Sequence, residues 1–305
     1  MERLLNVGYR AYHKKFGWYE VVAKVSSQKY TVRFDDTGFE YDASKYHILD
    51  NLISDKCGKY FHQVGETYNH PKYGEYKIVE ILKGKKVVIE FTKTKYRYTT
   101  TTNNAIKGNV KDVFMPTIFG VGYVGSNECK ITKQQSYITW HNMLKRCYDV
   151  DTQEKHPTYK GCSVCKEWHC FLTFKKWFDK HYAERWCLDK DILKKGNKVY
   201  SPQTCCFVPN EINVLFTNRK RFRGETLIGV CYFPPARRFK ECFKASMSKG
   251  YTKTYLGVYK NEFDAFNAYK KAKEDYIKEI ADKWKDQLDP RVYEALYNYK
   301  VEITD

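Results

Sequence analysis

The sequence lacks long apolar runs. No segment approaches the roughly 18 apolar residues of a membrane span, and the first residues, MERLLNVGYRAYHKKFG, include no apolar run of signal-peptide length. We therefore expect a protein that stays in the cytosol and has no membrane partner. In that reducing compartment the eleven cysteines, an odd number, are expected to be free thiols or metal ligands and not a disulfide framework.

Acidic residues are scarce relative to basic ones. The chain has 36 Asp and Glu against 54 Lys and Arg, which gives a net charge of +18 and a pI near 9.2. An excess of this size favours a polyanion partner, because lysine and arginine side chains that meet phosphates release the counterions held there. A basic protein that is merely soluble is the alternative. The 17% of aromatic residues suits stacking on unpaired bases, although most are expected in cores.

Residues 1 to about 125 contain an internal duplication with an offset of 57 residues, as between Tyr19 and Tyr76. The other matched pairs are Val7 and Val64, Gly8 and Gly65, Gly17 and Gly74, Val22 and Val79, Phe34 and Phe91, Thr37 and Thr94, and Tyr41 and Tyr98. In each copy short alternating segments joined by polar turns predict β-hairpins. Each copy looks like a Tudor- or KOW-like small β-barrel. Such a barrel could bind a protein partner or nucleic acid, or serve as a spacer.

The middle of the chain predicts two helices after residues 116–135, which have the composition of a linker or extended arm. Apolar periodicity predicts helices over residues 136–148 and 167–181. Between them, Cys162 and Cys165 have the spacing of half a zinc site. They stand in an apolar pattern, however, and cysteine is among the most buried residue types. We favour buried thiols over zinc ligands.

Residues 188–218, LDKDILKKGNKVYSPQTCCFVPNEINVLFTN, predict a strand, a loop, a second strand and a short helix. That order can bring Asp189 and Asn213 together although 24 positions separate them. Two oxygen-bearing side chains at such a meeting point suit a hard divalent cation. The sequence therefore predicts a possible Mg²⁺ site at Asp189 and Asn213.

The segment from Trp140 to Asn218 resembles the HNH homing endonucleases of phages and mobile introns. The residues that carry the resemblance are Trp140, Met143, Arg146, Cys147, Val164, Cys165, Trp168, Phe171, Leu188, Asp189, Asp191, Asn197, Tyr200, Ser201, Pro202, Cys206, Ile212 and Asn213. The resemblance implies a ββα nuclease module with flanking helices. It also implies a phage protein in the cytosol of an infected bacterium.

The resemblance makes Asp189 a metal ligand and puts Lys190 where the family has a histidine that deprotonates water. No histidine follows His181. A lysine has a reference pKa near 10.4, so its use as a base at pH 7 would cost roughly 4 to 5 kcal/mol, whereas a protonated lysine beside a phosphate needs no shift. Asn197 and Tyr200 are the other catalytic candidates, one to place a water and one to replace the base.

Residues 219–260 carry 11 Lys and Arg against 2 Glu, which is half of the net charge of the chain. Alternation in residues 238–247 puts basic side chains on one face of a strand and mostly apolar ones on the other. With its neighbours this strand predicts a three-stranded antiparallel sheet, followed by a helix over residues 262–285. The nucleic-acid contacts predicted here are Arg219, Lys220, Arg221, Arg223, Arg237, Arg238, Lys240, Lys244 and Lys253.

Three strands and a packing helix, with Gly229-Val230 and Leu256-Gly257 at these places, resemble the APETALA-type domain of plant ethylene-response factors. In that family the exposed sheet face reads DNA. The tryptophans of the plant pattern are absent from these strands, so we expect phosphate contact without the family's base reading.

The sequence thus predicts an α+β protein of several domains. They are two small β-barrels at 1–60 and 61–125, an HNH-like module at 126–218, an APETALA-type domain at 219–288 and a tail at 289–305. We expect a protein that grips DNA or structured RNA, ribosomal RNA included, on a nuclease-like scaffold with impaired or lost cleavage. An active Mg²⁺-dependent homing or nicking endonuclease is the alternative.

Overall fold

The computed structural model describes residues 5–56, 63–127, 134–216, 225–235, 240–250 and 252–305. The chain divides into two compact units, residues 1–115 and 116–305. Both are built from small sheets, nearly all antiparallel, and the second also contains the longer helices. The α+β class predicted from the sequence is confirmed.

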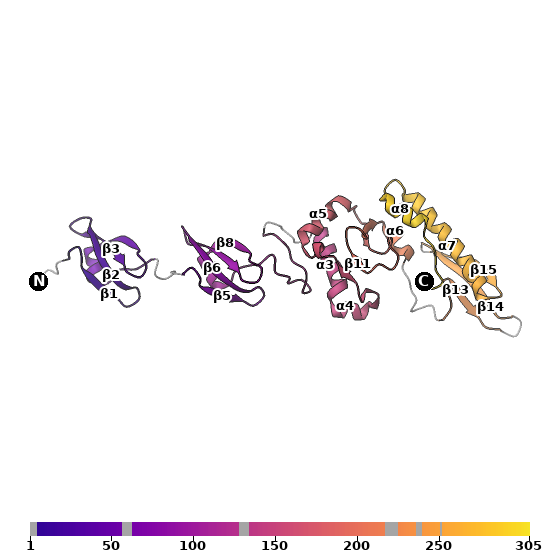
Figure 1. Ribbon diagram of the computed structural model, residues 1–305, viewed down its shortest axis with the longest axis horizontal. Coiled ribbons are helices and arrows are strands. Elements are labelled where there is room, and N and C mark those ends of the chain that lie inside the picture. The colour runs from indigo at the N-terminus through magenta and orange to yellow at the C-terminus, as the bar shows by residue number, and fades with distance from the viewer. Residues whose placement is uncertain (1–4, 57–62, 128–133, 217–224, 236–239, 251) are drawn as a thin grey trace. The chain divides into compact units, whose positions relative to one another are not determined.

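The first unit contains two similar four-stranded antiparallel meanders, each followed by a short helix (Figure 1). The first comprises β1 (Arg10–His13), β2 (Gly17–Lys24), β3 (Lys29–Phe34), β4 (Glu40–Ser44) and α1 (Lys45–Leu49). The second comprises β5 (Thr67–His70), β6 (Gly74–Leu82), β7 (Lys86–Phe91), β8 (Arg97–Thr101) and α2 (Thr102–Lys107). The hairpins predicted in both copies are confirmed.

Equivalent hydrogen bonds close the two copies. The buried Tyr19 hydroxyl donates to the Ile48 carbonyl at 3.2 Å, and the Tyr76 hydroxyl donates to the Ala105 carbonyl at 2.6 Å. Two further matched bonds, each 2.6 Å long, join Thr37 to Asp55 and Thr94 to Asp112. The same side chains therefore tie the end of each meander to its sheet.

The second unit begins with helices around an aromatic core formed by Trp140, Trp168, Phe171 and Phe174, all of them buried. Its elements are α3 (Gln135–Tyr148), α4 (Val150–Lys155), η1 (Pro157–Tyr159), β9 (Ser163–Val164), η2 (Lys166–His169), α5 (Phe171–His181), β10 (Cys187–Asp189), β11 (Val199–Tyr200), β12 (Cys206–Val208), α6 (Asn210–Asn213) and η3 (Val214–Phe216). Strand β10 pairs antiparallel with β12, and β9 pairs parallel with β11.

One sequence prediction is narrowed in this region and another fails in part. The segment predicted as a linker or extended arm is an arm packed against the helices in its described part, because Tyr123 exchanges backbone hydrogen bonds with His169 and Phe171 and Val124 is buried. The same bonds divide the helix expected over residues 167–181 into the 3₁₀ turn η2 and α5, with Cys170 extended between them. A tertiary contact thus overrides the helical periodicity.

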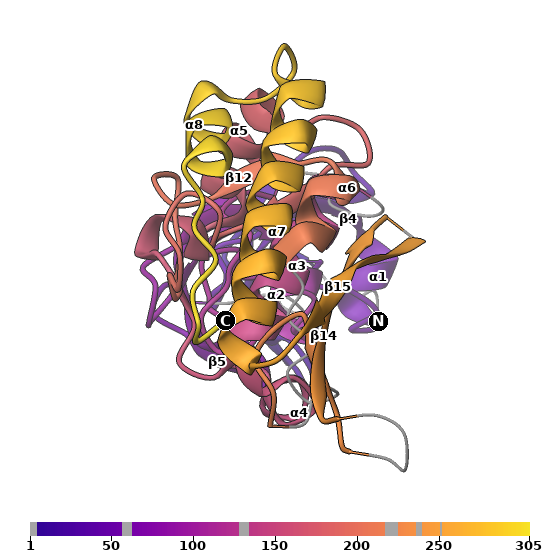
Figure 2. The same ribbon diagram turned by 90° about the vertical axis from the view of Figure 1, so that its right-hand side faces the viewer.

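The C-terminal part is the predicted three-stranded antiparallel sheet with a long helix on one face. It comprises β13 (Val230–Phe233), β14 (Cys242–Lys249), β15 (Thr252–Tyr259), α7 (Glu262–Trp284) and α8 (Pro290–Tyr297). Helix α7 runs alongside β14 and β15 (Figure 2). One apolar core continues from Ile212 of α6 into Ile277 of α7. Glu211 strengthens this junction by accepting hydrogen bonds from Lys283 and Trp284.

Candidate functional site

A polar cavity of about 330 Å³ lies between α3 and the segment from Trp186 to Asp191. Four of the predicted catalytic or metal-binding residues line it, namely Asp189, Lys190, Tyr200 and Asn213. The expectation that the chain brings Asp189 and Asn213 to one place is met in this respect. Asn197 is absent from the lining and lies in the loop behind it.

Asp189 ends strand β10, opposite Cys206 in the register. One of its carboxylate oxygens, Oδ1, accepts the backbone N–H groups of Asp191 at 2.7 Å and Ile192 at 2.8 Å. Burial raises the pKa of this carboxyl above its ordinary value. The carboxylate and the Asn213 amide oxygen are ligand types that suit Mg²⁺ together with water. Among the described residues, no group of three His, Cys, Asp or Glu side chains is arranged to hold a metal ion.

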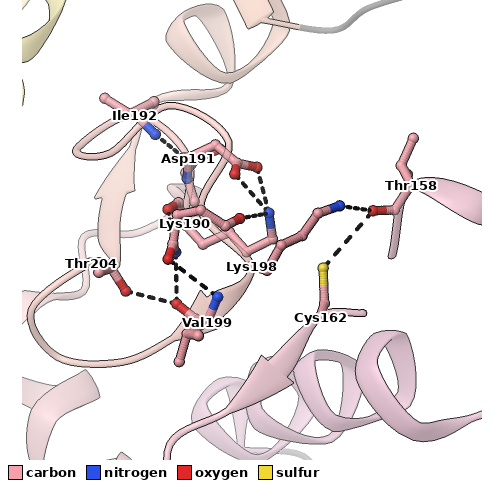
Figure 3. Close-up of polar contacts among 10 residues, drawn as sticks. Thr158, Cys162, Lys190, Asp191, Ile192, Lys198, Val199 and Thr204 are labelled. Atoms are coloured by element: carbon pink, nitrogen blue, oxygen red, sulfur yellow. Dashed lines mark hydrogen bonds and ion pairs between the residues drawn. The ribbon is translucent and has the colours of Figure 1, made fainter. Parts of the chain in front are cut away.

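Lys190 is buried, with 7% of its surface exposed, and its ammonium group is fully hydrogen-bonded. The Nζ atom donates to both carboxylate oxygens of Asp191 at 2.7 Å (Figure 3) and to the Asn197 carbonyl at 2.8 Å. An ammonium group has three N–H donors and no acceptor. Lys190 therefore holds the loop together as a cation, and this geometry offers no lone pair to a water molecule.

Asn197 closes the same loop from the other side. Its amide group donates to the Lys190 and Val199 carbonyls at 2.9 Å and 2.7 Å, and its side-chain oxygen accepts the Val199 N–H at 3.2 Å. Tyr200 is buried beside the loop, and burial raises the pKa of its hydroxyl. The Asn197 side chain, the candidate for placing a water, is thus engaged in the loop, and Tyr200, the candidate for replacing the base, is poorly suited to ionise.

The cavity wall on α3 is polar. Arg146 is among the residues that carry the resemblance, whereas Gln135, Thr139 and Asn142 were not predicted from the sequence. All four line this wall. They recur at spacings of four, three and four residues, which places them on one helix face. The signal that could have found them is this polar stripe, opposite the apolar one. Arg146 also lies over the Tyr159 ring, 5.5 Å from the ring centroid.

The two cysteines considered as zinc ligands belong to or pack against the apolar core, and Cys165 is only partly buried. Cys162 is buried, and its thiol points to the Thr158 carbonyl at 3.9 Å (Figure 3). Burial raises the pKa of the Cys165 thiol to about 11. A zinc ligand is a thiolate, and a raised pKa opposes its formation. Zinc binding at Cys165 would have to overcome that cost.

The outer face of the C-terminal sheet, meaning the face away from α7, carries basic, hydroxyl and apolar side chains. Lys244 stands opposite Cys231 and Val258 in the register, and Ser248 stands opposite Lys253. The alternate residues Ala245 and Met247 are buried against α7. The predicted alternation along β14 is therefore confirmed, and Lys244 is the one basic residue among its outward positions, which are Cys242, Lys244, Ser246 and Ser248.

The described lysines of the predicted contact set have no acidic partner. Lys240, Lys244 and Lys253 make no ion pair within the part of the chain that the structure describes, and Lys244 instead lies 4.7 Å from the Tyr255 ring centroid. By contrast Lys249, at the end of the same strand, pairs with Glu279 of α7 at 3.1 Å. Arg219, Lys220, Arg221, Arg223, Arg237 and Arg238 lie outside the described residues.

Comparison of the chain with known protein families, with curated proteins and with solved structures found no match. None of the helices that the structure describes has the length and apolar character needed to cross a membrane.

Proposed function

We propose that this protein binds nucleic acid through the outer face of its C-terminal sheet. Its nuclease-like module supports that sheet, and its cleavage activity is impaired or lost. The observation that carries the proposal is that Lys244 and Lys253 project from the outer face and have no carboxylate partner within the described part of the chain. The ammonium group of a lysine without a carboxylate partner is available to contact phosphates. The partner is DNA or structured RNA, with ribosomal RNA as one candidate, met in the cytosol of an infected bacterium.

We also propose a fold and a role for each domain. The two meanders are small barrels of the Tudor or KOW type that hold a protein partner or set a distance. Residues 126–218 form the HNH-like module and residues 219–288 the APETALA-type domain. The reducing cytosol keeps the cysteines as thiols.

A charge reversal on the sheet tests the proposal. Lys244→Glu removes one cation from the outer face, and Lys271→Glu makes the same change in net charge at an exposed site on α7. We expect Lys244→Glu to weaken binding of labelled duplex DNA and of a ribosomal RNA fragment far more than Lys271→Glu does, as measured by fluorescence anisotropy. Equal losses in the two variants would refute the placement of the interface.

The alternative is an active endonuclease, and one observation favours it. Asp189, Asn213 and Arg146 line a single cavity. If Mg²⁺ binds there, Asp189 and Asn213 would hold it, and it would supply charge stabilisation for a scissile phosphate. Arg146 would orient that phosphate through its guanidinium group.

The arrangement around Lys190 weighs against this alternative. General acid–base help is typically worth roughly 10² to 10⁴-fold in rate, and neither Lys190 nor Tyr200 is placed to give it. We expect supercoiled plasmid to stay intact with the purified protein and Mg²⁺ or Mn²⁺. Nicking that disappears in Asp189→Ala would establish the endonuclease instead.

A further inference from the structure

The outer face of the sheet is apolar as well as basic. Phe233, Tyr255 and Val258 expose 45%, 55% and 55% of their surface. They come from β13 and β15, the two strands that flank β14, and no described residue of the chain covers them. Burial of apolar side chains of this size against a partner lowers the free energy of the complex. Contact with phosphates alone would leave these apolar side chains exposed to water.

Charge and ring are adjacent on this face. The Lys244 ammonium lies 4.7 Å from the centroid of the Tyr255 ring, and Ser246 stands opposite Tyr255 in the register. A nucleotide presents a flat base next to a phosphate, and aromatic rings flanked by cations are what single-stranded nucleic acids bind. The Ser246 hydroxyl can both donate and accept a hydrogen bond at a base edge.

We propose that this face binds unpaired nucleotides, with a base stacked on Tyr255 and its phosphate at Lys244, in preference to a duplex. The inference rests on the proposed function and narrows it to single-stranded DNA or RNA. In a duplex the base faces are stacked on each other and only their edges are open in the grooves. The ring of Tyr255 then has no base face to meet, so its stacking free energy is gained only on an unpaired strand.

Phe233 and Val258 extend the same platform. Val258 pairs with Lys244 across the strands, and Phe233 pairs with Cys242. Neighbouring bases of an unpaired strand can therefore lie along the face from β15 to β13, across the strand that carries Lys244. No Asp or Glu occupies an outward position among the described residues of the three strands, so nothing there repels the phosphates.

The test compares oligonucleotides of one sequence as single-stranded DNA, single-stranded RNA and duplex DNA, each titrated with the full chain by fluorescence anisotropy. At least one single strand should bind more tightly than the duplex. Stacking on one aromatic ring is worth enough that Tyr255→Leu should weaken single-strand binding by about 5- to 100-fold. The duplex should lose little. The single strand that binds more tightly identifies the source of the unpaired nucleotides.

Two further variants separate stacking from folding. Tyr255→Phe keeps the ring and should keep single-strand binding within about 2-fold of the wild type, because the base–ring contact does not need the hydroxyl. Tyr297→Leu removes an exposed tyrosine of α8, away from the sheet, and should change nothing. Unchanged single-strand binding in Tyr255→Leu would overturn the inference.

The result also distinguishes this inference from the proposed function. If duplex binds as tightly as either single strand, or more tightly, and Lys244→Glu weakens it, the unpaired-strand inference falls and the proposed function stands. If no nucleic acid binds, or if none is affected by Lys244→Glu, the proposed function falls and the inference falls with it.

Discussion

The cavity around Asp189 and the outer face of the C-terminal sheet both carry lysines, but they use them differently. In the loop behind the cavity, Lys190 gives all three of its hydrogen bonds to Asp191 and Asn197. On the sheet, Lys244 and Lys253 have no carboxylate partner among the described residues. A buried charge is tolerated when it is paired and hydrogen-bonded. The residues around a lysine, and not its position in a motif, therefore determine whether its ammonium group stabilises the fold or is open to a ligand.

The largest loss of stability is expected from a substitution in the C-terminal sheet region, at Gly229. Its φ is +80°, and a Cβ added there would lie 2.0 Å from the Tyr269 ring of α7. Gly229→Ala should lower the free energy of unfolding by about 2 to 5 kcal/mol, because backbone strain adds to overpacking. Urea titration measures the loss. The control is Gly250→Ala, where φ is +58° and the space is open, with an expected loss of about 1 to 2 kcal/mol. Equal losses in the two variants would contradict the close packing of this glycine under α7.

The second-largest loss of stability is expected in the loop that Lys190 holds together. Lys190→Met leaves the Asn197 carbonyl and the Asp191 carboxylate without their donor, and we expect a loss of about 2 to 4 kcal/mol in unfolding free energy. Lys198→Met is the control, since that lysine is exposed and donates only to the Thr158 carbonyl. If Lys190→Met folds as stably as the control, the structural role assigned to Lys190 is wrong.

A smaller effect is expected where the two regions join. The hydrogen bond from Lys283 lowers the pKa of Glu211 below its ordinary value of 4.5. A depressed carboxyl pKa stabilises the fold above pH 4.5, and that contribution is lost as the pH falls through the folded-state pKa. Because the pair is partly exposed, Glu211→Gln should cost only about 0.5 to 1 kcal/mol at pH 7.

The pH dependence of that loss checks its origin. The difference in unfolding free energy between wild type and Glu211→Gln should be smaller at pH 3 than at pH 7. Glu294→Gln, at an exposed site on α8, should show little difference at either pH. A loss in Glu211→Gln that is the same at pH 3 and pH 7 would show that packing, and not the ion pair, holds the junction.

Sequence periodicity predicted the sheet and the repeats because their patterns are local. Alternation alone placed Lys244 outward and Ala245 inward, and the 57-residue offset located both meanders. The break at Cys170 was not predictable, because it depends on backbone bonds from Tyr123, which is distant in the sequence. The network around Lys190 was missed for a similar reason, since the fold of the loop decides which carbonyl its ammonium reaches.

The salt dependence of nucleic-acid binding tests the central claim most directly. The affinities of the wild type and of Lys244→Gln/Lys253→Gln should be measured for one oligonucleotide across a series of salt concentrations. If both lysines contact phosphates, the slope of log K against log salt should become shallower by about 1.4 to 1.8 in the double variant. An unchanged slope would show that these lysines meet no phosphate and would contradict the account.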